Sequence, residues 1–132
     1  MLVERRPLPG AGHPHGLAIV PGTAIGYVAC DGNDRPLAVD LATGAVLTNL
    51  PVGRDPDVLA IDSGARRLYV ASESGNASTY DISTVVSPKS LGEVFVGKDA
   101  HSVSVDPGTH LLYLPLANVG ALAVMRVLQP QP

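Results

Sequence analysis

Short apolar runs separated by polar turn residues recur along the whole chain. Runs such as LAIV (residues 17–20), IGYVAC (25–30) and RLYVAS (67–72) are rich in Val, Leu, Ile and Ala and are bounded mainly by Gly, Pro, Asn, Asp or Ser. This composition and these boundaries are typical of β-strands joined by turns. In no stretch of about ten residues or more do the apolar positions recur at the helical spacing. The pattern therefore predicts an all-β protein.

The runs belong to a unit that occurs three times. The segments HPHGLAIVPGTAIGYVAC from His13, DPDVLAIDSGARRLYVAS from Asp55 and DAHSVSVDPGTHLLYLPL from Asp99 align over their whole length. Several runs are apolar at consecutive positions, which indicates strands that are covered on both faces. Four short strands in a unit of about 40–45 residues are typical of one blade of a β-propeller.

We expect one partial propeller domain over residues 1–132, built from blades of four antiparallel strands. The repeats are predicted at approximately 13–53, 54–97 and 98–130. Residues 2–10 are predicted to be an outer strand that completes a blade. Since propellers have about 4–8 blades, about three blades in one chain do not close a ring.

The strands of the repeat unit with which the first and last segments align bear on how a ring would close. Residues 2–10 (LVERRPLPG) align with the fourth strand of a unit, VLTNLPVG at 46–53, whereas ALAVMRVL at 121–128 is the third strand of the last unit. Two interpretations stay open. The chain is either part of a longer propeller or a half-ring that a second copy completes, each N-terminal strand pairing with the partner's last blade.

The repeat resembles a known family. The stretch LAIVPGTAIGYVACDGNDRPLAVDLATGAVLTNLPVG is similar to the YVTN-type β-propeller repeat. The matching positions are Tyr27-Val28, Tyr69-Val70, Asp40, Asp81, Gly53 and Gly97. The departures are Cys30, Ser72 and Leu116, which stand where the family has Asn.

The resemblance implies a toroid of about seven blades, often in exported or cell-surface proteins of bacteria and archaea. It implies no single activity, because this repeat is a scaffold onto which different sites are built. The chain itself shows no positively charged segment followed by an apolar run at its start, so no secretory signal is visible.

The amino-acid composition predicts the kind of core and excludes some classes of function. Hydrophobic residues make up 45% of the chain, with one Phe and no Trp, which predicts an aliphatic core. The net charge of −3 gives no basic surface for nucleic acid, and no apolar run approaches the roughly 20 residues of a membrane helix. Cys30, the single cysteine, is expected to be a buried structural thiol, and His110 to lie at a solvated turn.

Polar residues stand just before the first strand of each unit, and they are the candidate site. In a propeller this strand lines the central channel, so these side chains would converge at one rim. They are His13, His15, Asp55, Asp57, Asp99 and His101. Two imidazoles and a carboxylate (His15, Asp57 and His101) suit a divalent metal ion, with neighbouring carboxylates orienting the imidazoles. The plainer interpretation is ordinary turn chemistry and solvation.

Two functions follow from this rim. The first is a binding or interaction module that takes a protein or small ligand at the channel rim. The alternative is a metal-dependent, lactonase-like hydrolase with His15, Asp57 and His101 as metal ligands and Asp55 or Asp99 as the general base. The sequence alone identifies no certain cofactor, and a divalent metal ion is the one that the second function would use.

Overall fold

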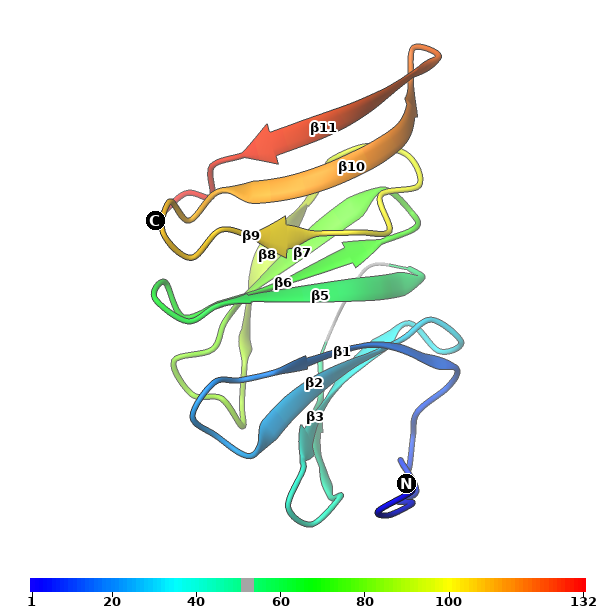
Figure 1. Ribbon diagram of the computed structural model, residues 1–132, viewed down its shortest axis with the longest axis vertical. Coiled ribbons are helices and arrows are strands. Elements are labelled where there is room, and N and C mark those ends of the chain that lie inside the picture. The colour runs from blue at the N-terminus through cyan, green and yellow to red at the C-terminus, as the bar shows by residue number, and fades with distance from the viewer. Residues whose placement is uncertain (51–53) are drawn as a thin grey trace.

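The computed structural model describes residues 1–50 and 54–132 and consists of three antiparallel sheets stacked face to face (Figure 1). The first sheet is formed, in spatial order, by β1 (Pro14–Ile19), β2 (Ile25–Cys30), β3 (Arg35–Asp40) and β4 (Val46–Asn49). The second is formed by β5 (Pro56–Asp62), β6 (Arg67–Ser72), β7 (Asn76–Asp81) and β8 (Lys89–Phe95). The third is formed by β9 (Ser104–Val105), β10 (Leu112–Val119) and β11 (Leu122–Leu128). The predicted all-β blade fold is confirmed.

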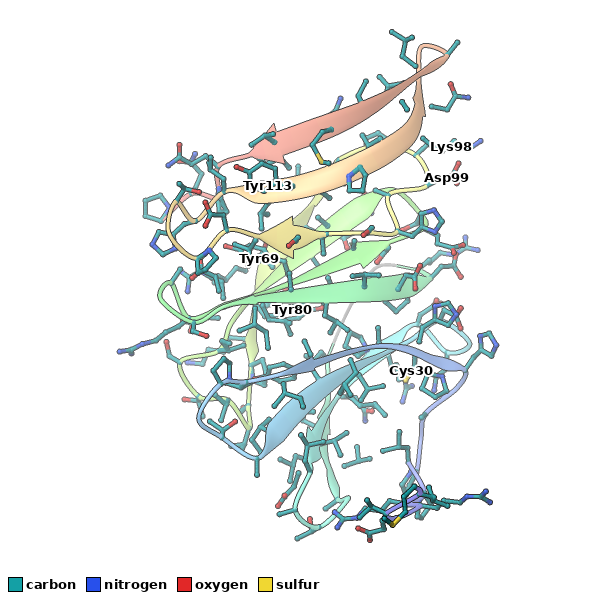
Figure 2. All side chains as sticks on the ribbon, viewed as in Figure 1. Cys30, Tyr69, Tyr80, Lys98, Asp99 and Tyr113 are labelled. Carbon is teal, nitrogen blue, oxygen red and sulfur yellow. The ribbon has the colours of Figure 1, made fainter. Side chains whose placement is uncertain are left out.

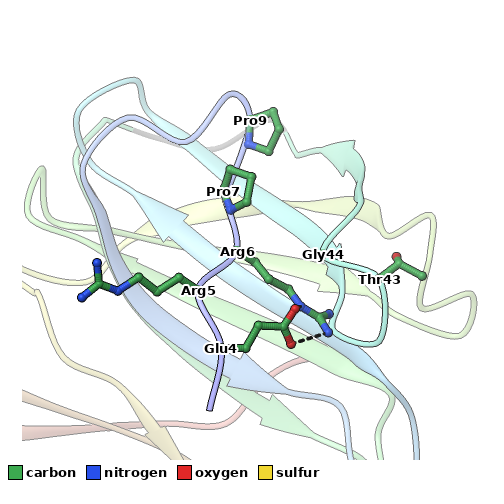
Figure 3. A pocket seen from close by; sticks show the side chains of 7 residues that line it. All are labelled: Glu4, Arg5, Arg6, Pro7, Pro9, Thr43 and Gly44. Atoms are coloured by element: carbon green, nitrogen blue, oxygen red, sulfur yellow. Dashed lines mark hydrogen bonds and ion pairs between the residues drawn. The ribbon is translucent and has the colours of Figure 1, made fainter. Parts of the chain in front are cut away.

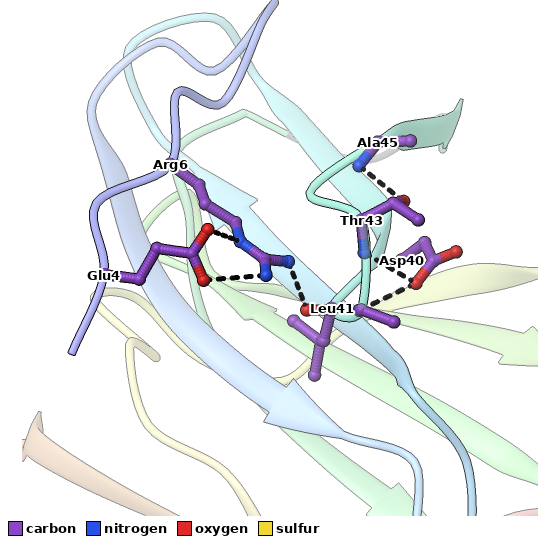
Figure 4. Close-up of polar contacts among 7 residues, drawn as sticks. Glu4, Arg6, Asp40, Leu41, Thr43 and Ala45 are labelled. Carbon is purple, nitrogen blue, oxygen red and sulfur yellow. Dashed lines mark hydrogen bonds and ion pairs between the residues drawn. The ribbon is translucent and has the colours of Figure 1, made fainter.

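The turns explain why each sheet is a simple meander. Between β3 and β4, the Asp40 carboxylate accepts hydrogen bonds from the backbone N–H groups of Ala42 and Thr43, at 2.8 and 3.3 Å (Figure 4). Gly44 follows with φ at 78°, a conformation that glycine adopts without strain. An Asp that binds its own backbone two residues on, followed by a glycine, reverses the chain within a few residues.

Apolar side chains between the sheets form the core. Every residue of β2 is buried, as expected for a strand covered on both faces. One cluster, which includes Tyr27 and Leu68, packs the first sheet against the second, and another, which includes Tyr69 and Leu114, packs the second against the third. The core is aliphatic apart from buried tyrosines. Tyr27 also donates a hydrogen bond of 2.7 Å to the carbonyl oxygen of Val85, in the loop after β7.

The N-terminal segment forms no strand. Leu8 and Ala11 pack on the outer face of the first sheet, and the Arg6 guanidinium donates a hydrogen bond of 2.6 Å to the carbonyl oxygen of Leu41 (Figure 4). Figure 3 shows the same segment, from Glu4 to Pro9, beside the turn at Thr43 and Gly44. The proposal that residues 2–10 complete a blade of another chain or another part of the ring stays a prediction. The end of the first predicted repeat, 51–53 with Gly53, lies outside the described residues.

The third sheet has three strands in the described part of the chain, with β11 at its outer edge. Leu122, Met125 and Val127 of this strand are exposed. Over residues 1–50 and 54–132, no helix is long and apolar enough to cross a membrane.

Candidate functional site

The candidate site lies where the first strand of each sheet begins. Strands β1, β5 and β9 lie next to one another in the stack (Figure 1), and their N-terminal ends are on the same side of the molecule. Figure 2 places Cys30, the last residue of β2, on this side together with Lys98 and Asp99, which precede β9. We call this end of the stack the rim.

The same backbone turn leads into each of the three strands. His13, Asp55 and Asp99 have positive φ angles of 52°, 56° and 57°. In the first two repeats this residue's carbonyl oxygen accepts a hydrogen bond from the residue just after the second strand, Asp31 or Glu73. The repeat predicted from the sequence is therefore also present in the backbone conformation. This shared turn brings the neighbouring side chains to equivalent places on each sheet.

Asp57 joins side chains from all three repeats. Its Oδ1 lies 2.5 Å from Nδ1 of His15, and its Oδ2 lies 3.5 Å from Nδ1 of His101. The structure thus brings together the three residues that the sequence analysis selected as metal ligands. The Asp57 side chain is only 13% exposed, whereas the two histidine side chains are about half exposed.

The hydrogen bond from Asp57 is the main reason that the pKa of His15 lies above its ordinary value. The negative charge of Asp57 acts in the same direction, with smaller contributions from Asp31 and Glu73, while desolvation opposes the shift. A carboxylate that accepts from one ring nitrogen stabilises the imidazolium and fixes the ring. The other nitrogen, Nε2, is then the one left to face a ligand.

Two carboxylates that the sequence analysis missed complete the rim. Asp31 Oδ1 lies 2.6 Å from Nδ1 of His13, and Glu73 Oε1 lies 3.5 Å from Nδ1 of His101. Both residues directly follow the second strand of their repeat, and Ala117 occupies the aligned position in the third. An alignment extended by one residue beyond the tyrosine-containing strand would have found them.

The rim residues form two groups with the spacing of metal ligands. One consists of His13, His15 and Asp31, and the other of Asp57, Glu73 and His101. In each group the ligand atoms lie within 4.8 Å of one another. The predicted ligands are therefore divided between the groups, and the hydrogen bond between His15 and Asp57 connects them.

Asp55 and Asp99 shape the rim through their backbones. The Asp55 N–H donates a 2.8 Å hydrogen bond to the carboxylate of Asp34, and the Asp99 carbonyl oxygen accepts a 2.9 Å hydrogen bond from the N–H of His101. Asp99 and His101 also line an open hollow of about 430 Å³ that continues over Pro115 and Met125. A small ligand fits in such a hollow.

The fourth histidine has a structural contact at the opposite end of the strands. His110 directly follows the turn and is exposed, as expected, and its Nδ1 also lies 2.6 Å from Oδ2 of Asp62, whose side chain is fully buried. The sequence did not predict this contact because it joins residues that are distant in sequence and lie in different sheets. Cys30 is buried as expected, and burial raises the pKa of its thiol, so it is unsuited to act as a nucleophile.

Comparison with known proteins identifies the fold. No protein-family model matches the chain, and no curated protein matches it. Among solved structures, Kuenenia stuttgartiensis hydrazine synthase aligns with a TM-score of 0.71 and 18% identity, over 87% of this chain and 32% of that one. The β-propeller domain of Cps50 (Swd1) from Myceliophteria thermophila gives 0.69 and 18%, over 89% and 40%. A putative 6-phosphogluconolactonase from Bacteroides uniformis gives 0.73 and 15%, over 91% and 38%.

These similarities establish the architecture and not an activity. The chain has the fold of β-propeller blades, and it spans between about a third and two fifths of the length of these matched chains. Since unrelated activities are built on this fold, the function has to be argued from the rim.

Proposed function

We propose that the protein is a ligand-binding module of a β-propeller, with the rim as its binding surface. The observation that carries this proposal is the position of Asp57 between His15 and His101, which unites side chains from three repeats. A site of this kind depends on the stacking of the blades, because no single repeat contains it. Binding residues positioned by a rigid scaffold are typical of propeller rims and other loop-bearing ends of folds.

The charge of the rim suggests the class of ligand. The rim residues include five carboxylates (Asp31, Asp55, Asp57, Glu73 and Asp99), whereas Arg54 and Lys98 are the cationic residues directly before Asp55 and Asp99 in the sequence. Negative charge around a partly exposed hollow favours a partner that carries positive charge and hydrogen-bond donors. A lysine-containing peptide segment meets both requirements.

The test is a titration of the labelled protein with a short lysine-rich peptide, followed by backbone amide NMR shifts. We expect shifts concentrated at the rim and weakened by salt, because exposed charges are screened within about 10 Å at 0.1 M ionic strength. Asp57→Asn and Glu73→Gln should weaken binding. Asp106→Asn is the matched control, since Asp106 lies in the turn between β9 and β10 at the other end of the strands.

Three results would count against this proposal. They are shifts spread over the whole surface, shifts unchanged in Asp57→Asn, or equal binding of a glycine-serine peptide of the same length. The last result would show that the rim does not select positive charge.

A second candidate, a metal-dependent lactonase-like hydrolase, is favoured by the contacts of Asp57 with His15 and His101 and by the structural similarity to a putative 6-phosphogluconolactonase. In this function His15, Asp57 and His101 hold a divalent metal ion, which lowers the pKa of bound water. Asp55 or Asp99 then acts as the general base. The test is hydrolysis of a six-membered sugar lactone with added Zn²⁺ or Mn²⁺, and a rate equal to that of the protein-free blank would contradict it.

A further inference from the structure

We infer that His13, His15 and Asp31 form a binding site for a divalent transition-metal ion, as an alternative to the set His15, Asp57 and His101, with which it shares His15. The inference stands independently of the proposed peptide binding, and it competes with the metal site of the lactonase-like function because both use His15. It starts from the sequence HPH, which places two histidines two residues apart at the start of β1. His13 directly precedes the strand with a φ of 52°, and His15 is the second residue of the strand.

The three side chains have the spacing of a metal site. The His13 and His15 ring centroids lie 5.6 Å apart with an interplanar angle of 30°, and the ligand atoms of all three residues lie within 4.8 Å of one another. Zn–N and Zn–O bonds are about 2.0–2.2 Å, so two ligand atoms on one ion lie at most about 4.2 Å apart. The spacing of the three residues is therefore close to the spacing that one ion requires.

The backbone around these residues is tied together before any ion binds. The Gly32 N–H donates a 3.0 Å hydrogen bond to the Gly12 carbonyl oxygen, and the Asn33 side-chain amide donates one of 2.8 Å to the carbonyl oxygen of Gly10. A Cβ on Gly32 would lie 2.9 Å from Cβ of His13, which only glycine avoids. The loop that carries Asp31 is thus held close against the segment that carries His13.

Asp57 supplies the outer hydrogen bond that metal-bound histidines commonly have. It holds Nδ1 of His15 from the neighbouring sheet and so leaves Nε2 to bind the ion. The site is also accessible, since the side chains of His13, His15 and Asp31 are 73%, 48% and 25% exposed. An ion can therefore reach the ligands without a conformational change of the sheets.

The donor set selects the kind of metal. Two imidazoles and one carboxylate suit Zn²⁺, Co²⁺, Ni²⁺ or Fe²⁺, whereas Mg²⁺ and Ca²⁺ prefer oxygen ligands alone. Three protein ligands leave at least one position for water or a ligand. The other group at the rim, with two carboxylates and a single histidine, is a weaker match to these ions.

The chain's four histidines allow a discriminating experiment. Zn²⁺ binding is measured by calorimetry, and Co²⁺ binding by visible absorption, for the whole chain and for His13→Ala, His15→Ala, His101→Ala and His110→Ala. His110→Ala is the matched control because His110 lies at the other end of the strands. Asp31→Asn, which keeps the shape of the side chain, tests the carboxylate, and circular dichroism checks that each variant is folded.

We expect one ion per chain, lost in both His13→Ala and His15→Ala and retained in His101→Ala and His110→Ala. Losing an outer hydrogen bond to a metal ligand weakens binding by about 10–100-fold, so the loss of a ligand itself should reach at least about 100-fold. Asp57→Asn changes only the outer hydrogen bond and should weaken metal binding by about 10–100-fold. A bound ion should also raise the melting temperature of the unaltered chain, since it binds the folded state alone.

Two results would overturn the inference. Loss of binding in His101→Ala with full retention in His13→Ala would assign the ion to the other set, and absence of saturable Zn²⁺ and Co²⁺ binding would exclude a site. Neither result bears on the peptide titration, which is carried out without added metal.

Discussion

Ser72 is a polar residue in a buried, mostly apolar environment. Its side chain is fully buried, and its hydroxyl oxygen has no hydrogen-bond partner among the described residues. The aligned positions in the other repeats are Cys30 and Leu116, which are equally buried and need no partner. An unsatisfied buried hydroxyl destabilises the folded state.

We therefore expect Ser72→Ala to raise the free energy of unfolding by about 1 kcal/mol. Urea denaturation of the variant and of the exposed control Ser74→Ala measures this difference. A loss of stability in Ser72→Ala alone would mean that the small cavity left by the hydroxyl destabilises the protein more than removal of the unsatisfied polar atom stabilises it.

Removing the contact between His110 and Asp62 should have the opposite effect, because it should lower the free energy of unfolding. Asp62 Oδ2 accepts from His110 at 2.6 Å, and its Oδ1 accepts from the N–H of Ala65 at 3.0 Å. His110→Ala removes one partner of a buried carboxylate, and such charged hydrogen bonds contribute about 1.5–3 kcal/mol. Denaturation of His110→Ala and of the exposed control His13→Ala measures the free energy of unfolding of each variant. Equal stability of both variants would contradict the prediction.

Tyr27 gives a prediction for alkaline pH. Burial raises its pKa to about 12, whereas in the unfolded chain a tyrosine titrates near pH 10. Above about pH 10 the unfolded state loses protons that the folded state retains, so stability falls as the pH rises from about 10 to about 12. Melting temperatures over pH 8–12 should show this decline, and Tyr27→Phe should make it shallower. An identical alkaline decline in Tyr27→Phe would rule out this residue as a cause.

The residues of the rim show which parts of a site the sequence can predict. His15, Asp57 and His101 were predicted together because each occupies the same position of the repeat, and a stack of equivalent sheets places such positions side by side. Asp31 and Glu73 were missed because their contacts come from the end of a different strand, across the sheet. The same reason hid the contact of His110, since long-range pairing depends on packing that one repeat does not encode.

At the scale of elements, the close approach of β1 and β5 holds the rim together. A Cβ on Gly16 of β1 would clash with the backbone carbonyl oxygen of Asp57 and lie 2.8 Å from a methyl group of Leu59. Glycine is required here by a neighbouring backbone and not by an unusual φ. The glycine therefore sets the distance between the strands that carry His15 and Asp57.

Gly16→Ala should separate these strands and destabilise the fold by about 1–3 kcal/mol, the usual range for overpacking. It should also weaken the contact of His15 with Asp57, which a histidine NMR titration detects as a pKa nearer the ordinary value. Gly108→Ala is the control, because its Cβ would meet only a side-chain oxygen of Asp106 at 3.4 Å. Equal stability of the two variants would show that β1 and β5 can separate freely.

The strands themselves were predictable from the pattern, and the N-terminal segment was not. Each predicted run from LAIV to ALAVMRVL overlaps a strand of the structure, because runs of Val, Leu and Ile between turn residues have few other folded states. Residues 2–10 contain Pro7 and Pro9, which lack backbone N–H donors and confine a strand to the edge of a sheet. Whether such a segment pairs depends on the strand edge that is offered to it.

At the scale of the whole molecule, the outer face of the third sheet is apolar, and no other sheet of the described residues covers it. Tyr69 of β6 is buried by the third sheet, but the equivalent Tyr113 of β10 is only half-buried. Tyr113 pairs with Val127 and Pro115 pairs with Met125 across β10 and β11, and Val127 and Met125 are both exposed. In a propeller this face packs against the next blade, and both sources of that blade, a longer chain and a second copy, stay predictions.

We predict that the chain associates in solution through this face. Burying an apolar side chain the size of Met125 or Val127 contributes about 1.5–3 kcal/mol, and open faces of this kind and unpaired edges promote association. Light scattering after size exclusion should show a mass above that of one chain, and Met125→Lys with Val127→Lys should shift it toward the monomer. Leu91→Lys on the exposed β8 is the control for added charge. A monomer at every concentration, or an equal effect of the control, would mean that this face does not carry the contact.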